Sequence, residues 1–155
     1  MRGGSQEEAL KRALRFLSYR ARSEAEVRSK LARSGFPQRV IEATLSRLRS
    51  LKLVNDETFA RSWAQTRAEN RGYGPLRIKR ELGQKGISQS LIGRVLQETF
   101  NQEEEKQRAR KLLERRFRGE DLSDLKILRR AVDFLRRRGY RDSVIGEVVK
   151  QPLGD

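Results

Sequence analysis

Residues 82–92 read LGQKGISQSLI, and the same pattern occurs at residues 31–41 (LARSGFPQRVI) and at residues 135–145 (LRRRGYRDSVI). Each copy has a leucine, three mostly polar residues, a glycine, a large apolar residue, three further residues and an apolar pair. No gap is needed to align the copies. Three copies in register indicate an internal repeat, which constrains the fold more strongly than any single element does.

The repeated pattern describes the end of one helix, a tight turn and the start of another helix. A glycine just past a helix can adopt the left-handed conformation that closes the last turn. The large residue after each glycine lies five positions before an isoleucine, which is the spacing of a hydrophobic staple. Apolar residues four positions before the leucine and four after the isoleucine extend one face of each helix. Each copy is therefore predicted to be a helical hairpin.

An apolar stripe before each hairpin predicts one additional helix per copy. Ser23 and Glu26 match a capping box at the start of a second helix, and Asn55 and Asn101 are good caps for the helices that open the next two copies. The sequence thus predicts an all-α fold of three tandem three-helix repeats, at residues 6–54, 55–100 and 101–152. Because units this small must share apolar surface, we expect an elongated, slightly curved array with flexible joints.

The third copy carries two further expectations about its helices. Leu125, Leu128, Val132 and Leu135 form a stripe that predicts the buried face of its second helix. The acidic run at residues 103–105 is predicted to be a solvated first helical turn rather than a metal site, because adjacent residues on a helix point in different directions.

Composition restricts the function. The chain of 155 residues has 36 Lys and Arg against 21 Asp and Glu, a formal net charge of +15, and neither Cys nor His. Such an excess attracts polyanions such as nucleic acid or acidic protein surfaces. Without Cys or His there are no disulfides, no thiolate metal sites and no imidazole base. We expect no cofactor, no membrane segment, no signal peptide and a cytoplasmic location.

The sequence also argues against catalysis. It contains no G-x-x-x-x-G-K-[ST] loop for a nucleotide. The cluster Gly72-Tyr73-Gly74 is explained more simply as a turn, and Glu24 and Glu26 are explained by helix capping. The protein is therefore predicted not to be an enzyme.

The positive charge is unevenly distributed along the chain. Residues 9–54 hold 12 Lys and Arg against 3 Asp and Glu, whereas residues 101–155 hold 15 against 11. Many of the charges in the last segment can pair within its own helices. Our hypothesis is that the first repeat provides the strongest long-range attraction to a polyanion, and a charge-reversal series in each repeat would test it.

Two groups of residues resemble a known family. The first is residues 19–27 (YRARSEAEV) followed by Lys30-Leu31, and the second is residues 55–60 (NDETFA) followed by Arg67, Gly74-Pro75, Glu81-Leu82 and residues 85–87. In order and spacing they are similar to the bacterial regulatory protein RecX family. The resemblance covers essentially the whole chain and is strongest from about residue 10 to residue 100.

This resemblance implies a function. Proteins of the RecX family bind the RecA recombinase and modulate it, usually by inhibition. They dock in the helical groove of the RecA–DNA filament, span neighbouring protomers and impede ATP hydrolysis and strand exchange. The resemblance therefore implies a monomeric regulator whose partners are the RecA filament and, through weak salt-dependent contacts, single- and double-stranded DNA. An elongated cationic array suits that role, because many weak contacts along a groove add as avidity.

Basic residues near the second helices and the turns are the predicted contacts. They are Arg20, Arg22, Arg28, Lys30 and Arg33 in the first repeat, Arg71, Arg77, Lys79, Arg80 and Lys85 in the second, and Arg137 in the third. Some of these side chains are expected to stabilise their own bundles instead, because arginine stems pack well on apolar surface.

Two other functions remain open at the level of sequence. A DNA-binding protein that acts without RecA would use the glycine turns as helix-turn-helix motifs, although a leucine stands where close helix approach usually requires a small residue. A scaffold built on a helical array is the other. Titration with RecA filaments and with naked DNA at raised salt separates a filament regulator from a DNA binder.

Overall fold

The computed structural model describes residues 5–153, and within that range the chain is helical with no strand. The helices are α1 (Gln6–Tyr19), α2 (Glu24–Arg33), α3 (Gln38–Ser50), α4 (Asp56–Asn70), α5 (Pro75–Gln84), α6 (Gln89–Thr99), α7 (Gln102–Arg116), α8 (Leu125–Arg138) and α9 (Asp142–Val149).

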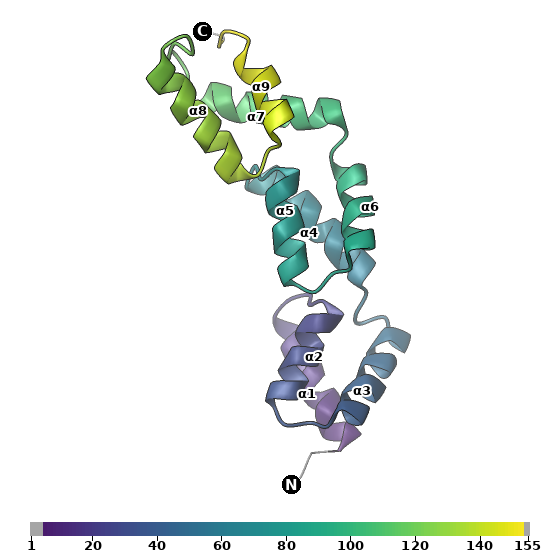
Figure 1. Ribbon diagram of the computed structural model, residues 1–155. Coiled ribbons are helices and arrows are strands. Elements are labelled where there is room, and N and C mark those ends of the chain that lie inside the picture. The colour runs from purple at the N-terminus through teal and green to yellow at the C-terminus, as the bar shows by residue number, and fades with distance from the viewer. Residues whose placement is uncertain (1–4, 154–155) are drawn as a thin grey trace.

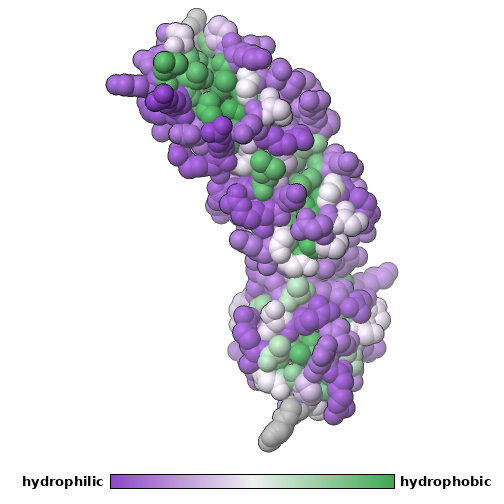
Figure 2. Space-filling view, viewed as in Figure 1, coloured by the Kyte–Doolittle hydropathy of each residue, from purple (hydrophilic) through white to green (hydrophobic). Residues whose placement is uncertain are grey.

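The helices form three units that follow one another along a curved, elongated molecule (Figure 1). The first unit is α1–α3, the second α4–α6 and the third α7–α9, and each has its own cluster of buried apolar residues. Figure 2 shows a mostly hydrophilic surface with smaller apolar patches along its length. The predicted all-α array of three-helix repeats is confirmed, and the boundaries at 6–54, 55–100 and 101–152 stay a prediction.

The repeated residues form the centre of each unit. The leucine of each copy is fully buried at Leu31, Leu82 and Leu135, and the large residue after each glycine is almost fully buried. Burying a side chain of this size stabilises the fold by about 1.5–3 kcal/mol. The three copies of the pattern are therefore the sites where each small core is fixed.

The turn glycines adopt the predicted left-handed conformation. Their φ angles are 90° at Gly35, 77° at Gly86 and 95° at Gly139. In each turn the N–H after the glycine donates to the carbonyl of the repeated leucine: Phe36 to Leu31 at 3.2 Å, Ile87 to Leu82 at 3.1 Å and Tyr140 to Leu135 at 3.1 Å. This bond closes the last helical turn in all three copies.

The predicted caps are also present. Ser23 Oγ accepts the N–H of Glu26 at 3.1 Å, and Glu26 Oε1 accepts the N–H of Ser23 at 3.1 Å, so the capping box is complete. Asn55 accepts the N–H of Thr58, and Asn101 accepts the N–H of Glu104. The starts of α2, α4 and α7 thus follow from local chemistry.

Two expectations about the third unit were wrong. Leu125 is 67% exposed, because Phe117 and Leu122 from the end of α7 and the following loop supply the core at that end of α8. Glu105 is fully buried instead of solvated, and it accepts from the backbone N–H and the guanidinium of Arg141. Arg141 is the N-cap residue of α9, so the carboxylate lies at the positive end of that helix.

The joint between the first two units is hydrogen-bonded. Ser23 Oγ donates to the carbonyl of Lys85 at 2.6 Å, and the N–H of Glu24 donates to Asp56 Oδ1 at 2.9 Å. A Cβ built on Gly86 would lie 2.3 Å from the Cβ of Ala25. The glycine turn of the second unit therefore rests directly on the first turn of α2.

The second joint repeats this arrangement, with main-chain N–H groups as the donors at the turn. The N–H groups of Gly74 and Leu76 donate to the carbonyls of Arg138 at 2.7 Å and Gly139 at 2.9 Å. A Cβ on Gly74 would lie 2.7 Å from the carbonyl of Gly139, so no larger residue fits there. The turn of the third unit thus rests on the start of α5. The joints expected to be flexible are bonded contacts, and bending them requires breaking these bonds.

Replacing the turn glycines separates the helix-ending role from the joint. Gly35→Ala and Gly86→Ala both place a side chain in the left-handed region, at a cost of about 1 kcal/mol each. Gly35 has nothing within 4 Å, whereas Gly86 lies against Ala25. We expect Gly86→Ala to lower the free energy of unfolding by about 1–3 kcal/mol more than Gly35→Ala in urea titrations. Equal losses in the free energy of unfolding would show that the Gly86 turn does not contribute to packing against the neighbouring unit.

Tyr140 provides a second test of the joint. Its hydroxyl donates to the carbonyl of Gly72 at 3.0 Å, and burial raises the pKa of Tyr140 from 10.0 to about 12. Stability contributed by the neutral phenol is complete below the unfolded pKa and is lost as pH rises from about 10 to about 12. Tyr140→Phe should cost about 1 kcal/mol at pH 7 and should lose stability less steeply than the unmodified chain above pH 10, measured by urea unfolding across pH.

Candidate partner-binding surface

A cleft of about 970 Å³ lies between the first and second units. Its walls are the turn between α1 and α2, the end of α3 with the loop that follows, and the outer face of α4. Two units contribute to it, so its shape depends on the joint between Ser23 and Lys85.

The lining of this cleft is cationic. It contains no carboxylate and six basic residues, of which Arg49 pairs with Glu24 and Arg20 with Glu26, each at 2.6 Å: Arg20, Arg22, Arg49, Lys52, Arg67 and Arg71. Apolar side chains, including Leu53 and Trp63, lie among them with several hydroxyl and amide groups. Leu53 is 45% exposed, so the rim offers apolar surface as well as charge. A lining of this mixed kind suits an acidic segment of a protein better than a small molecule.

Trp63 is held in the cleft wall by several contacts. Its ring stacks with Phe59 at 5.7 Å between centroids, and its Nε1–H donates to Glu81 Oε1 at 3.0 Å. The guanidinium of Arg67 lies 4.1 Å from the ring centroid and Lys85 Nζ lies 5.1 Å from it. Cation–π contacts of this geometry hold a positive charge at the surface without neutralising it.

Arg22 is fixed against its own bundle. Its guanidinium lies 3.8 Å from the Phe16 ring centroid, and its Nε–H donates to the carbonyl of Phe16 at 3.4 Å. Burial and the neighbouring charge of Arg20 lower the pKa of Arg22 from its ordinary value. Arg22 therefore contributes a charge whose position is fixed before any partner arrives.

Glu26 neutralises part of the cleft edge. Arg20 Nη2 lies 2.6 Å and Lys85 Nζ 3.3 Å from Glu26 Oε2, so this carboxylate joins a cation of each unit. Burial raises the pKa of Glu26, but the hydrogen bonds from Arg20 and the Ser23 N–H and the charges of Arg20 and Lys85 outweigh it, and the pKa lies below its ordinary value. Glu26 therefore stays ionised at neutral pH and strengthens the joint.

The predicted contact residues do not gather in one place. Three of them line the cleft, namely Arg20, Arg22 and Arg71. Three are held by internal contacts: Arg28 by Glu42 at 2.8 Å, Arg77 by the Tyr73 ring at 3.8 Å, and Lys85 by Glu26. Five have no ion pair among the described residues: Lys30, Arg33, Lys79, Arg80 and Arg137.

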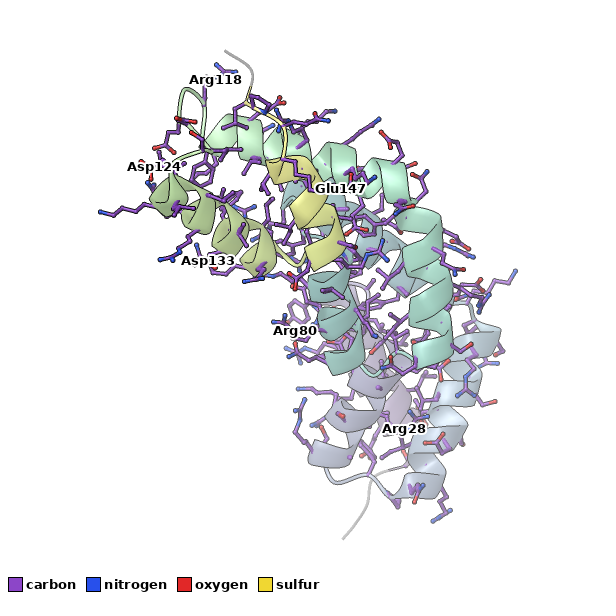
Figure 3. All side chains as sticks on the ribbon, turned by 45° about the horizontal axis from the view of Figure 1, so that its top comes forward. Arg28, Arg80, Arg118, Asp124, Asp133 and Glu147 are labelled. Carbon is purple, nitrogen blue, oxygen red and sulfur yellow. The ribbon has the colours of Figure 1, made fainter. Side chains whose placement is uncertain are left out.

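These placements leave the partner contacts a prediction. Arg28 and Arg80 lie on different units (Figure 3), and Arg33 lies near the turn at the N-terminal end of the molecule. The eleven predicted contacts are distributed over all three units. A partner that contacted most of them would have to follow the molecule along its length.

Sequence reasoning missed several cleft residues. Arg49, Lys52 and Arg67 line the cleft with Trp63, and none was among the predicted contacts. The spacing of Phe59, Trp63 and Arg67 gave a signal, because residues four apart on a helix lie on one face. Arg49 and Lys52 gave none, since the cleft exists only once two units are joined.

Two other findings bear on the chemistry. Among residues 5–153, no three His, Cys, Asp or Glu side chains lie close enough to hold a metal ion. No helix in that part of the chain is both long and apolar enough to span a lipid bilayer.

Comparison with known proteins assigns the chain to a family. Models of the first, second and third three-helix domains of RecX match residues 9–48, 55–96 and 103–149. The chain belongs to the RecX family. The regulatory protein RecX of Mycolicibacterium smegmatis is 36% identical over 155 aligned residues, which cover 97% of this chain and 82% of that protein. That of Mycobacterium marinum is 38% identical over 146 residues, covering 93% and 84%.

Solved structures show the same fold. A crystal structure of regulatory protein RecX has a TM-score of 0.80 and 30% identity, covering 94% of this chain and 73% of that one. The crystal structure of RecX from Lactobacillus salivarius has a TM-score of 0.81, covers 94% of both chains and is 23% identical. RecX is a family of regulatory proteins, which agrees with the resemblance that the sequence suggested.

Proposed function

We propose that this protein regulates the RecA recombinase, most simply as an inhibitor, by lying in the groove of the RecA–DNA filament across neighbouring protomers. Bound there, it would impede ATP hydrolysis and strand exchange. Membership of the RecX family supports the regulatory role, since the relatives are named as regulatory proteins. The cationic cleft between the first two units is the observation that carries the proposed mode of binding.

The shape of the molecule supports binding along a groove. Three units follow one another in a curved array, so one molecule can contact several subunits of a filament (Figure 1). Hydrogen bonds at the joints, such as Ser23 to Lys85 and Gly74 to Arg138, hold the curve before binding. A pre-formed shape loses less conformational entropy on association. Weak contacts at successive subunits then add as avidity.

The cleft is suited to a protein segment with negative charge. Its six basic groups are interspersed with exposed apolar surface at Leu53 and with the amphipathic ring of Trp63. Tryptophan and arginine are the residues most often responsible for binding energy at protein interfaces. DNA within the filament would add a separate, salt-dependent attraction to the net charge of +15.

The alternative is a DNA-binding protein that acts without a recombinase. The net charge favours it, but the joints argue against helix-turn-helix docking. The turns at Gly86 and Gly139 are pressed against Ala25 and Arg77, so two of the three hairpins cannot enter a DNA groove while the joints are closed. Only the turn at Gly35 has open space around it.

The direct test is the RecA ATPase on single-stranded DNA, measured with and without this protein. We expect the unmodified chain to inhibit and Lys52→Glu/Arg67→Glu to inhibit with an apparent affinity at least about tenfold weaker, a loss of about 1.4 kcal/mol. Both residues line the cleft and neither is ion-paired among the described residues.

The matched control is Lys126→Glu/Arg129→Glu, which changes the charge equally on exposed positions of α8 outside the cleft. It should inhibit like the unmodified chain. Equal weakening by both variants would refute the cleft as the contact. If the unmodified chain has no effect on RecA but binds naked DNA, the alternative function is favoured.

A further inference from the structure

A second recess lies at the joint between the second and third units. It has a volume of about 400 Å³ and is bounded by the end of α4, one face of α7 and the end of α8. Its basic side chains outnumber its acidic ones by six to one, with Glu69 the single carboxylate. The six are Arg71, Arg108, Lys111, Arg115, Arg116 and Arg138. We call this recess the joint pocket.

The cations of the joint pocket are not neutralised by neighbouring carboxylates. None of the six forms an ion pair within residues 5–153, although neighbours on α7 such as Lys106 and Arg110 do. Arg138 Nη1 donates to the carbonyl of Arg71 at 2.7 Å, and its guanidinium lies 5.0 Å from the Phe134 ring centroid. Glu69 accepts a hydrogen bond from Gln65, a neutral side chain. Like charges collected this closely repel one another, and a bound anion would relieve that repulsion.

The spacing along α7 indicates how large the anion is. Arg108, Lys111 and Arg115 stand at positions i, i+3 and i+7, on one face of the helix. They extend over about 10 Å of helix axis, a length along which one strand of a duplex carries about three phosphates. This row of three cations, which we call the α7 stripe, is longer than a single phosphate group.

The backbone of the pocket does not offer a nucleotide cradle. Phosphate loops bind through free main-chain N–H groups. Here the N–H of Tyr73 donates to the carbonyl of Arg67, and that of Gly74 donates to the carbonyl of Arg138. The Tyr140 ring is 1% exposed, so it gives no face on which a base could stack. Recognition is left to long, movable cationic side chains, which contact a phosphate backbone without reading its sequence.

We propose that the joint pocket binds the phosphate backbone of a nucleic-acid strand, through Arg108, Lys111 and Arg115 of α7 together with Arg71 and Arg138. Arg71 also lines the cleft between the first two units, so a strand seated in the joint pocket lies beside the proposed protein contact. The molecule would then hold protein and nucleic acid at adjacent joints. The inference does not depend on which protein occupies the cleft.

The experiment measures binding of the full chain to a fluorescently labelled single-stranded oligonucleotide by anisotropy across a range of salt concentrations. Lys111→Glu/Arg115→Glu should weaken binding at least about tenfold and should reduce the slope of log K against log salt by about 1.4, since each phosphate contact with a single strand contributes about 0.7. The control, Arg39→Glu/Arg47→Glu, makes the same charge change on exposed positions of the first unit and should weaken binding less than about threefold. That result would contradict the hypothesis that the first repeat provides the strongest attraction to a polyanion. Equal weakening by the two pairs would overturn the proposal in favour of attraction by net charge alone.

Two further arms complete the test. Lys111→Gln/Arg115→Gln removes the cations without adding repulsion, so it decides the matter if the Glu variant does not fold; retained affinity there would also overturn the proposal. Inorganic tripolyphosphate should compete only weakly, because it fills part of the α7 stripe. Competition as effective as that of the oligonucleotide at equal phosphate concentration would instead identify a free polyphosphate site.

The Lys111→Gln/Arg115→Gln variant, added at a saturating concentration, should still inhibit the RecA ATPase. If the proposed function is wrong, neither the unmodified chain nor any variant will inhibit it.

Discussion

At each joint, a glycine turn rests on the N-terminal end of the second helix of the preceding unit. The rest of the structure depends on this contact. At the first joint Gly86 meets Ala25, and at the second Gly139 meets Arg77 and Gly74. In both places the carbonyl before the glycine accepts a hydrogen bond from the N-cap residue of that helix, through Ser23 Oγ or the Gly74 N–H. One contact, used twice, turns three small bundles into one curved body.

Much of this could be predicted from the sequence. The left-handed glycines, the buried leucines and the capping box at Ser23 follow from local rules, because each depends on residues within a few positions. What could not be predicted depends on contacts between distant parts of the chain. Glu105 is buried because Arg141, the N-cap residue of α9, donates hydrogen bonds to its carboxylate, and Leu125 is exposed because Leu122 fills the core. Nothing within α7 or α8 distinguishes these outcomes.

The same distinction explains the candidate sites. The sequence identified cations near the turns, and three of them line the cleft, but Arg28, Arg77 and Lys85 are occupied by internal partners that lie up to 60 positions away. The cleft and the joint pocket both form between units, so residues such as Lys52 and Lys111 became candidates only with the joints in place. Both candidate sites therefore depend on the stacking of units rather than on any one repeat.

The measurement that tests this account most directly is the distance distribution between the first and third units in the free protein. The chain has no cysteine, so Ser46→Cys and Lys126→Cys give two unique sites for spin labels on exposed positions of α3 and α8. Pulsed electron–electron double resonance should give one narrow distribution, because the joints hold the units in a single arrangement before any partner binds. A broad or multi-peaked distribution would contradict the account.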